Sequence, residues 1–97
     1  MGFPCRFTRL AESDLEEIAL FIAMDSPRDA LAFVAELRAH CEIIALQPEA
    51  YALREEYGAG VRITAHGRYL IFHAVRDGAL VIERVLHGAR HLSALKL

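Results

Sequence analysis

The sequence predicts an α+β domain of the order β-α-α-β-β-β, in which a helical hairpin packs on an antiparallel sheet. Three observations predict it: two consecutive segments with apolar residues at helical spacing, two apolar strand-like runs joined by Asp77-Gly78, and a short alternating segment near the N-terminus. The 97 residues, 55% of them hydrophobic and 25% charged, are typical of a globular chain with a single core. We therefore expect residues 1–97 to form one domain.

The first elements are a short strand and a helix. Residues 3–7 alternate between apolar and other side chains, which predicts a strand, and Pro4 favours a place at the sheet edge or among the first residues of the strand. Thr8 fits the N-cap of a helix that runs to about Met24. The core stripe expected for this helix consists of Ala11, Leu15, Ile18 and Ile22.

A second helix begins at once. Ser26 fits an N-cap, Pro27 the first helical position and Asp29 the third, and Gln47-Pro48 ends the segment. Its apolar stripe consists of Ala30, Val34, Leu37, Cys41 and Ile44. Two helices with so short a connection form an antiparallel hairpin, whose apolar face must cover one face of the sheet.

Four apolar residues remain outside these stripes, namely Leu20, Phe21, Leu31 and Phe33. They either widen the core face of the hairpin or form an exposed patch that binds another chain.

The C-terminal half supplies the sheet. Residues 48–60 lack periodicity and predict a connecting loop with room for one helical turn, and residues 61–65 predict a short strand. Residues 68–76 are apolar on both faces, which is typical of a central strand. Asp77-Gly78 predicts a type I′ turn, so residues 80–86 return antiparallel. Strict alternation places Val81, Glu83 and Val85 on one face of this strand, and Leu80, Ile82, Arg84 and Leu86 on the other.

Charge divides the chain unevenly. Residues 1–60 hold five Arg against eleven Asp and Glu, a net of -6, whereas residues 61–97 hold six Arg and Lys against two acidic residues, a net of +4. Either acidic helices surround an ordinary sheet, or the sheet receives an anionic partner. The net charge of -2 argues against strong sequence-independent binding of nucleic acid.

Several classes of protein and site are not expected. There is no apolar run of eighteen residues and no signal-peptide core, so we expect a cytoplasmic protein without a membrane span. We expect Cys5 and Cys41 to be reduced cysteines in the core. His87 and His91 have a metal-like spacing, but Gly88 lies between them and no third ligand is evident, so we expect neither a metal nor another cofactor.

Two blocks of this sequence resemble a known family. Gly67-Arg68-Tyr69-Leu70-Ile71-Phe72, followed after a turn by Ile82-Glu83-Arg84-Val85-Leu86-His87-Gly88-Ala89-Arg90, is similar to the end of the ParE toxins of the RelE/ParE superfamily. The resemblance covers essentially the whole chain. It implies a toxin that is not an enzyme, that inhibits DNA gyrase, and that a ParD-like antitoxin neutralises in a heterotetramer or larger complex.

Two residue sets follow as expectations within this resemblance. The expected target-binding residues are Arg68, Arg84, His87, Arg90 and His91. The expected antitoxin-binding residues are Leu20, Phe21, Leu31, Phe33 and Arg62. No residue is expected to be catalytic. Arg84 has an alternative interpretation, since an arginine at a strand end can pair with an acidic residue of the helical layer.

Two other functions stay open. The first is a RelE-like, ribosome-dependent mRNA endonuclease, in which arginine and histidine side chains such as Arg84 and His87 move protons and stabilise charge on the phosphate. Such nucleases characteristically use lysines and often a C-terminal tyrosine, whereas here the only lysine is Lys96 and no tyrosine follows Tyr69. The second is a non-toxic binding partner of the same fold.

Overall fold

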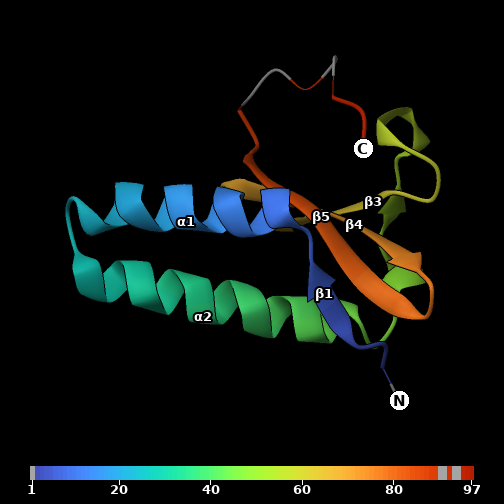
Figure 1. Ribbon diagram of the computed structural model, residues 1–97, viewed down its shortest axis with the longest axis horizontal. Coiled ribbons are helices and arrows are strands. Elements are labelled where there is room, and N and C mark those ends of the chain that lie inside the picture. Colours follow the sequence, from blue (N-terminus) through green and yellow to red (C-terminus); the bar gives the residue numbers. More distant parts are fainter. Residues whose placement is uncertain (1, 90–91, 93–94) are drawn as a thin grey trace.

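The computed structural model describes residues 2–89, 92 and 95–97, and places a helical hairpin against one face of a five-stranded sheet (Figure 1). The helices are α1 (Arg9–Ala23) and α2 (Pro27–Ile44), and the strands are β1 (Cys5–Phe7), β2 (Ala52–Leu53), β3 (Arg62–His66), β4 (Tyr69–Arg76) and β5 (Ala79–His87). This arrangement confirms the predicted α+β class, the helical hairpin and the C-terminal meander.

The sheet has the order β1-β5-β4-β3-β2, with β4 in the centre as expected. β1 runs parallel to β5, whereas the other pairs are antiparallel, so the sheet is mixed and the predicted antiparallel arrangement holds only for β2 to β5. β2 lies within the segment predicted as a loop and is flanked by the 3₁₀ turns Pro48–Ala50 and Glu55–Tyr57. Two residues are too few to show an alternating pattern, which is why the sequence does not reveal β2.

The helices begin where the capping residues predict. The Thr8 hydroxyl accepts a hydrogen bond of 3.0 Å from the Ala11 N–H, and the Ser26 hydroxyl accepts one of 3.2 Å from the Asp29 N–H. Asp77 and Gly78 both have positive φ, 50° and 75°, as a type I′ turn between β4 and β5 requires.

A β-bulge at Glu83 changes the faces of β5. Phe72 pairs with Arg84 and His73 with Ile82, so Glu83 is an extra residue without a partner on β4. The strict alternation predicted for β5 is therefore wrong beyond Glu83. Val85 packs in the helix-side core, together with residues from the other predicted face.

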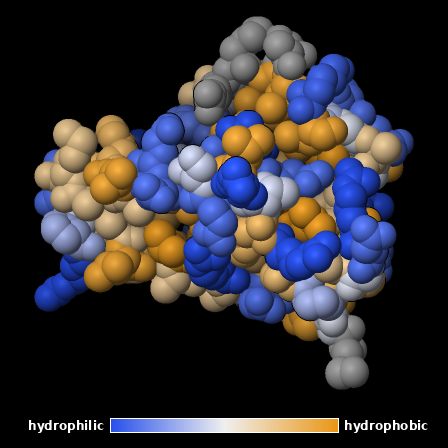
Figure 2. Space-filling model, viewed as in Figure 1, coloured by the Kyte–Doolittle hydropathy of each residue, from blue (hydrophilic) through white to orange (hydrophobic). Residues whose placement is uncertain are grey.

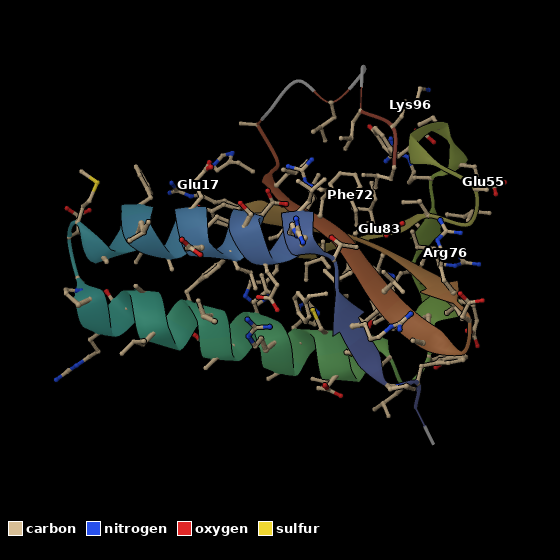
Figure 3. All side chains as sticks on the ribbon, viewed as in Figure 1. Glu17, Glu55, Phe72, Arg76, Glu83 and Lys96 are labelled. Atoms are coloured by element: carbon tan, nitrogen blue, oxygen red, sulfur yellow. The ribbon has the colours of Figure 1, made fainter. Side chains whose placement is uncertain are left out.

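Both faces of the sheet are covered by the chain itself. The helix-side core is built from α1, α2, β4 and β5, and it contains the buried Cys41. On the other face, Phe72 is covered by the Tyr57 turn and by the C-terminal segment (Figure 3). Three leucines of that segment, Leu92, Leu95 and Leu97, pack on this second cluster. The Leu97 N–H also donates a hydrogen bond of 2.7 Å to the Tyr57 carbonyl.

α1 completes the edge of β5 beyond the end of β1. The Thr8 hydroxyl donates a hydrogen bond of 2.8 Å to the Glu83 carbonyl. One oxygen of Asp14 accepts from the Val85 N–H at 3.0 Å and from Arg84 Nε at 2.7 Å, and the other accepts from Arg84 Nη2 at 2.9 Å. Side chains of α1 thus satisfy backbone groups that a neighbouring strand would otherwise bind.

We expect the substitution Asp14→Ala to lower the free energy of unfolding by about 3 kcal/mol, because it leaves the Arg84 cation and the Val85 N–H without their partner. The matched control is Glu12→Ala. It breaks the Arg38–Glu12 ion pair, whose side chains are 44% and 50% exposed, and we expect it to cost less than about 1 kcal/mol. Urea unfolding measures both, and equal losses would contradict the prediction.

His73 is the buried polar residue at the centre of the sheet. Its side chain is 0% exposed, and Nε2 forms a hydrogen bond of 2.8 Å with the Thr64 hydroxyl. Nδ1 has no partner. Burial, with smaller contributions from Arg62 and His40, lowers the pKa of His73 from 6.5 to about 4.

We expect this histidine to make stability depend on pH in a defined window. The unfolded chain binds a proton near pH 6.5 and the folded chain only near pH 4, so the contribution of His73 is complete above pH 6.5 and falls as the pH falls toward 4. The loss amounts to at most about 3 kcal/mol. Urea unfolding at pH 7.5 and at pH 5 measures it. The variant His73→Phe should lose this step but keep the carboxylate titrations, and an unchanged pH profile would refute the assignment.

Candidate functional site

An exposed apolar surface lies along the seam between the two helices. A groove of about 540 Å³ is lined by Glu16, Ala19, Leu20, Ala23, Pro27, Ala30, Leu31, Val34 and Ala35. The leucines at its rim, Leu20 and Leu31, are 63% and 77% exposed. Figure 2 shows apolar side chains gathered over the end of the hairpin where α1 connects to α2. We call this surface the hairpin groove.

A second hollow lies between α1 and the edge of the sheet where β4 begins and β5 ends. It has a volume of about 270 Å³ and is lined by Asp14, Glu17, Ile18, Phe21, Tyr69, Val85, Leu86 and His87. Phe21 is 69% exposed. An expected antitoxin-binding residue, Phe21, and an expected target-binding residue, His87, therefore line the same hollow. We call it the Glu17 hollow.

The four leftover apolar residues of the hairpin divide between two environments. Leu20 and Leu31 line the hairpin groove and Phe21 lines the Glu17 hollow, as an exposed patch requires. Phe33 instead packs edge-on against His66 and Tyr69, with ring centroids 5.5 and 5.2 Å away. Its packing agrees with the alternative in which leftover residues widen the core, while its expected contact with an antitoxin stays a prediction.

Arg84, an expected target-binding residue, is held in place by an acidic residue of α1. Its two hydrogen bonds to Asp14 raise its pKa above the usual value, and its side chain is 19% exposed. This pairing matches the alternative interpretation, in which Arg84 pairs with an acidic residue of the helical layer. The observed geometry makes Arg84 a residue that positions β5 against α1.

Arg68, Tyr69 and His87 come together at one end of the sheet. Arg68 is exposed in the β3–β4 turn, and its carbonyl accepts a hydrogen bond of 2.8 Å from the Gly88 N–H. Tyr69 pairs with His87 across β4 and β5, with ring centroids 5.3 Å apart. Arg90 and His91, also expected to bind the target, lie outside the described residues.

Arg62 lies away from the two hollows. It pairs with His73 across β3 and β4, toward the opposite end of β4 from the Tyr69–His87 pair. Its guanidinium donates a hydrogen bond of 2.8 Å to the Tyr51 carbonyl. The structure therefore does not bring Arg62 together with Leu20, Phe21 or Leu31.

Sequence reasoning missed Glu17 and Tyr69 as residues of a surface hollow. No site was predicted at Glu17, and Tyr69 was predicted only as a residue of the central strand. The spacing of Asp14, Glu17 and Phe21, at i, i+3 and i+7, places all three on one side of α1 and is the signal that was available. The part played by Tyr69 depends on which strand end meets α1, which no local pattern shows.

The described part of the chain has neither a cluster of metal ligands nor a membrane-spanning helix. Within residues 2–89, 92 and 95–97, no three His, Cys, Asp or Glu side chains come together as metal ligands. None of the helices described by the structure is long and apolar enough to cross a membrane.

Comparison with solved structures shows the same fold in two toxin-antitoxin systems. The chromosomal ParDE system from P. aeruginosa gives a TM-score of 0.73 at 20% sequence identity, covering 88% of this chain and 95% of that chain. The toxin-antitoxin complex RelBE2 from Mycobacterium tuberculosis gives a TM-score of 0.63 at 22% identity, covering 90% and 99%. At these identities the likeness shows the fold.

The family comparison is more specific. No curated protein gives a significant match to the sequence. The family described as "ParE toxin of type II toxin-antitoxin system, parDE" matches residues 5–92, which confirms the resemblance seen in the sequence. Because this match spans most of the chain, the protein belongs to the ParE toxin family of type II toxin-antitoxin systems.

Proposed function

We propose that this ParE-family toxin inhibits DNA gyrase and is neutralised by a ParD-like antitoxin that covers the hairpin groove. The observation that carries the antitoxin part is the groove itself, because its exposed leucines flank a floor of small apolar residues, and an amphipathic helix binds in grooves of this form. The protein acts by binding rather than by catalysis, in the cytoplasm, and its neutralised form is a heterotetramer or a larger complex.

The shape of the hairpin groove suits a helix of the partner. Its floor holds small residues, among them Ala19 and Ala30, and its rim holds Leu20 and Leu31. Small residues on the floor let a third helix approach closely, and its apolar stripe then packs between the two leucines. The likeness to two toxin-antitoxin systems supports a partner of this kind.

The surface that we propose to contact gyrase is the end of the sheet around Arg68 and His87. Both side chains are exposed, and no ion pair with another described residue occupies Arg68. Arg84 supports this surface by fixing β5 against α1. The membership of the family supports gyrase as the target.

We expect the double substitution Leu20→Ala and Leu31→Ala to weaken binding of the cognate antitoxin at least about tenfold, because the two side chains supply the rim of the groove. Titration calorimetry with the purified antitoxin measures the affinity. Leu53→Ala is the matched control, since Leu53 is 48% exposed on β2 and should change affinity by less than about twofold. An affinity equal to that of the unmodified toxin would contradict the proposed interface.

We expect the folded toxin, freed of antitoxin, to inhibit supercoiling by purified gyrase and to leave linear plasmid after the gyrase is denatured. Arg68→Glu should lower this inhibition, whereas Arg6→Glu on β1 should not, because Arg6 is exposed at a distant part of the sheet. Unaffected supercoiling from a demonstrably folded sample would refute gyrase as the target. Mapping of mRNA ends in a translation extract would then test the RelE-like alternative.

A further inference from the structure

We propose that the Glu17 hollow binds an arginine side chain of the antitoxin. This inference rests on the proposed function, because it names a contact within the toxin-antitoxin interface. It adds a charged, side-chain-specific site to the apolar hairpin groove.

The size of the hollow favours a single side chain. Its volume of about 270 Å³ lies just below the range of about 300–1,000 Å³ usual for small-molecule pockets. A helix or a nucleotide would not enter it. A long, unbranched side chain would fit with its stem against Ile18 and Phe21.

The charge of the hollow favours a cation. Asp14 is fully engaged with Arg84 and the Val85 N–H. Glu17 lies on the side of α1 that points away from α2 (Figure 3), and it forms no ion pair or hydrogen bond with another described residue. Among the described residues, the two carboxylates of Asp14 and Glu17 therefore face the single guanidinium of Arg84, and a second cation would balance the local charge.

The aromatic walls favour a guanidinium over an ammonium group. Tyr69 and His87 meet edge-on, at an interplanar angle of 79°, and Phe21 stands exposed at the same hollow. A planar guanidinium can stack on an aromatic face and still donate two hydrogen bonds to a carboxylate. Glu17 supplies that carboxylate.

The position of the hollow favours the antitoxin as the source of the arginine. Leu20 of the hairpin groove and Phe21 of the Glu17 hollow are consecutive residues of α1. An antitoxin segment that leaves the hairpin groove and crosses α1 would therefore lie directly over the Glu17 hollow. An arginine seated there would also cover His87, so the same contact would hide part of the expected target surface.

The first test is an NMR titration of the full toxin with Nα-acetyl-arginine-methylamide as the probe. We expect saturable shifts at Phe21, Tyr69 and His87, and binding at least about fivefold weaker for the neutral citrulline analogue. Glu17→Gln should weaken the arginine probe to a similar extent. Glu49→Gln makes the same change at an exposed site outside the hollow, and it should leave binding of the arginine probe unchanged. Equal shifts with both probes, or none, would overturn the site.

The second test is the affinity of the cognate antitoxin for the two variants. We expect Glu17→Gln to weaken binding at least about fivefold and Glu49→Gln to leave it within about twofold. Thermal unfolding of both variants confirms that they are folded. If antitoxin binds the unmodified toxin and both variants equally, this inference is wrong and the proposed function stands. If antitoxin does not bind the unmodified toxin, the proposed function fails and the antitoxin is excluded as the source.

Discussion

The carboxylate of Asp14 is the contact on which the position of α1 depends. It accepts two hydrogen bonds from the Arg84 guanidinium and a third from the Val85 N–H, so one side chain ties α1 to both the backbone and a side chain of β5. The pair is largely buried, and a charged hydrogen bond is stronger there than in water. Because α1 is fixed in this way, Glu17 and Phe21, one and two turns further along, stand over the end of β4 and β5.

The same contact also determines which residues of α1 are buried and which line the two hollows. On the sheet side, α1 contributes buried residues such as Leu15 to the core. On its other sides it contributes Leu20 to the hairpin groove and Phe21 to the Glu17 hollow. One helix therefore contributes to the core and to both hollows. The two hollows differ in character, since the hairpin groove is apolar and the Glu17 hollow is acidic and aromatic.

Much of the fold could be predicted from local signals, because caps, turns and helical periodicity are properties of neighbouring residues. Thr8, Ser26 and Asp77-Gly78 each marked an element boundary that the structure confirms. The bulge at Glu83 could not be read in this way, since an extra residue in a strand is defined by its partner on β4. The pairing of Arg84 with Asp14 joins residues 70 positions apart, so the sequence left two interpretations open. The Glu17 hollow likewise forms only where α1 meets the end of two strands.

The parallel pairing of β1 with β5 has a consequence for the order in which the toxin can form. Cys5 pairs with Leu80, so the first strand finds its place only after the last strand has been synthesised. The contacts of α1 with Arg84 and Val85 wait for the same strand. Closing contacts of such long sequence separation carries a large entropic cost, and the hairpin of β4 and β5, with its two-residue turn, is the local unit that can form before them. β1 and α1 can therefore take their final places against β5 only after residues 79–87 have been synthesised.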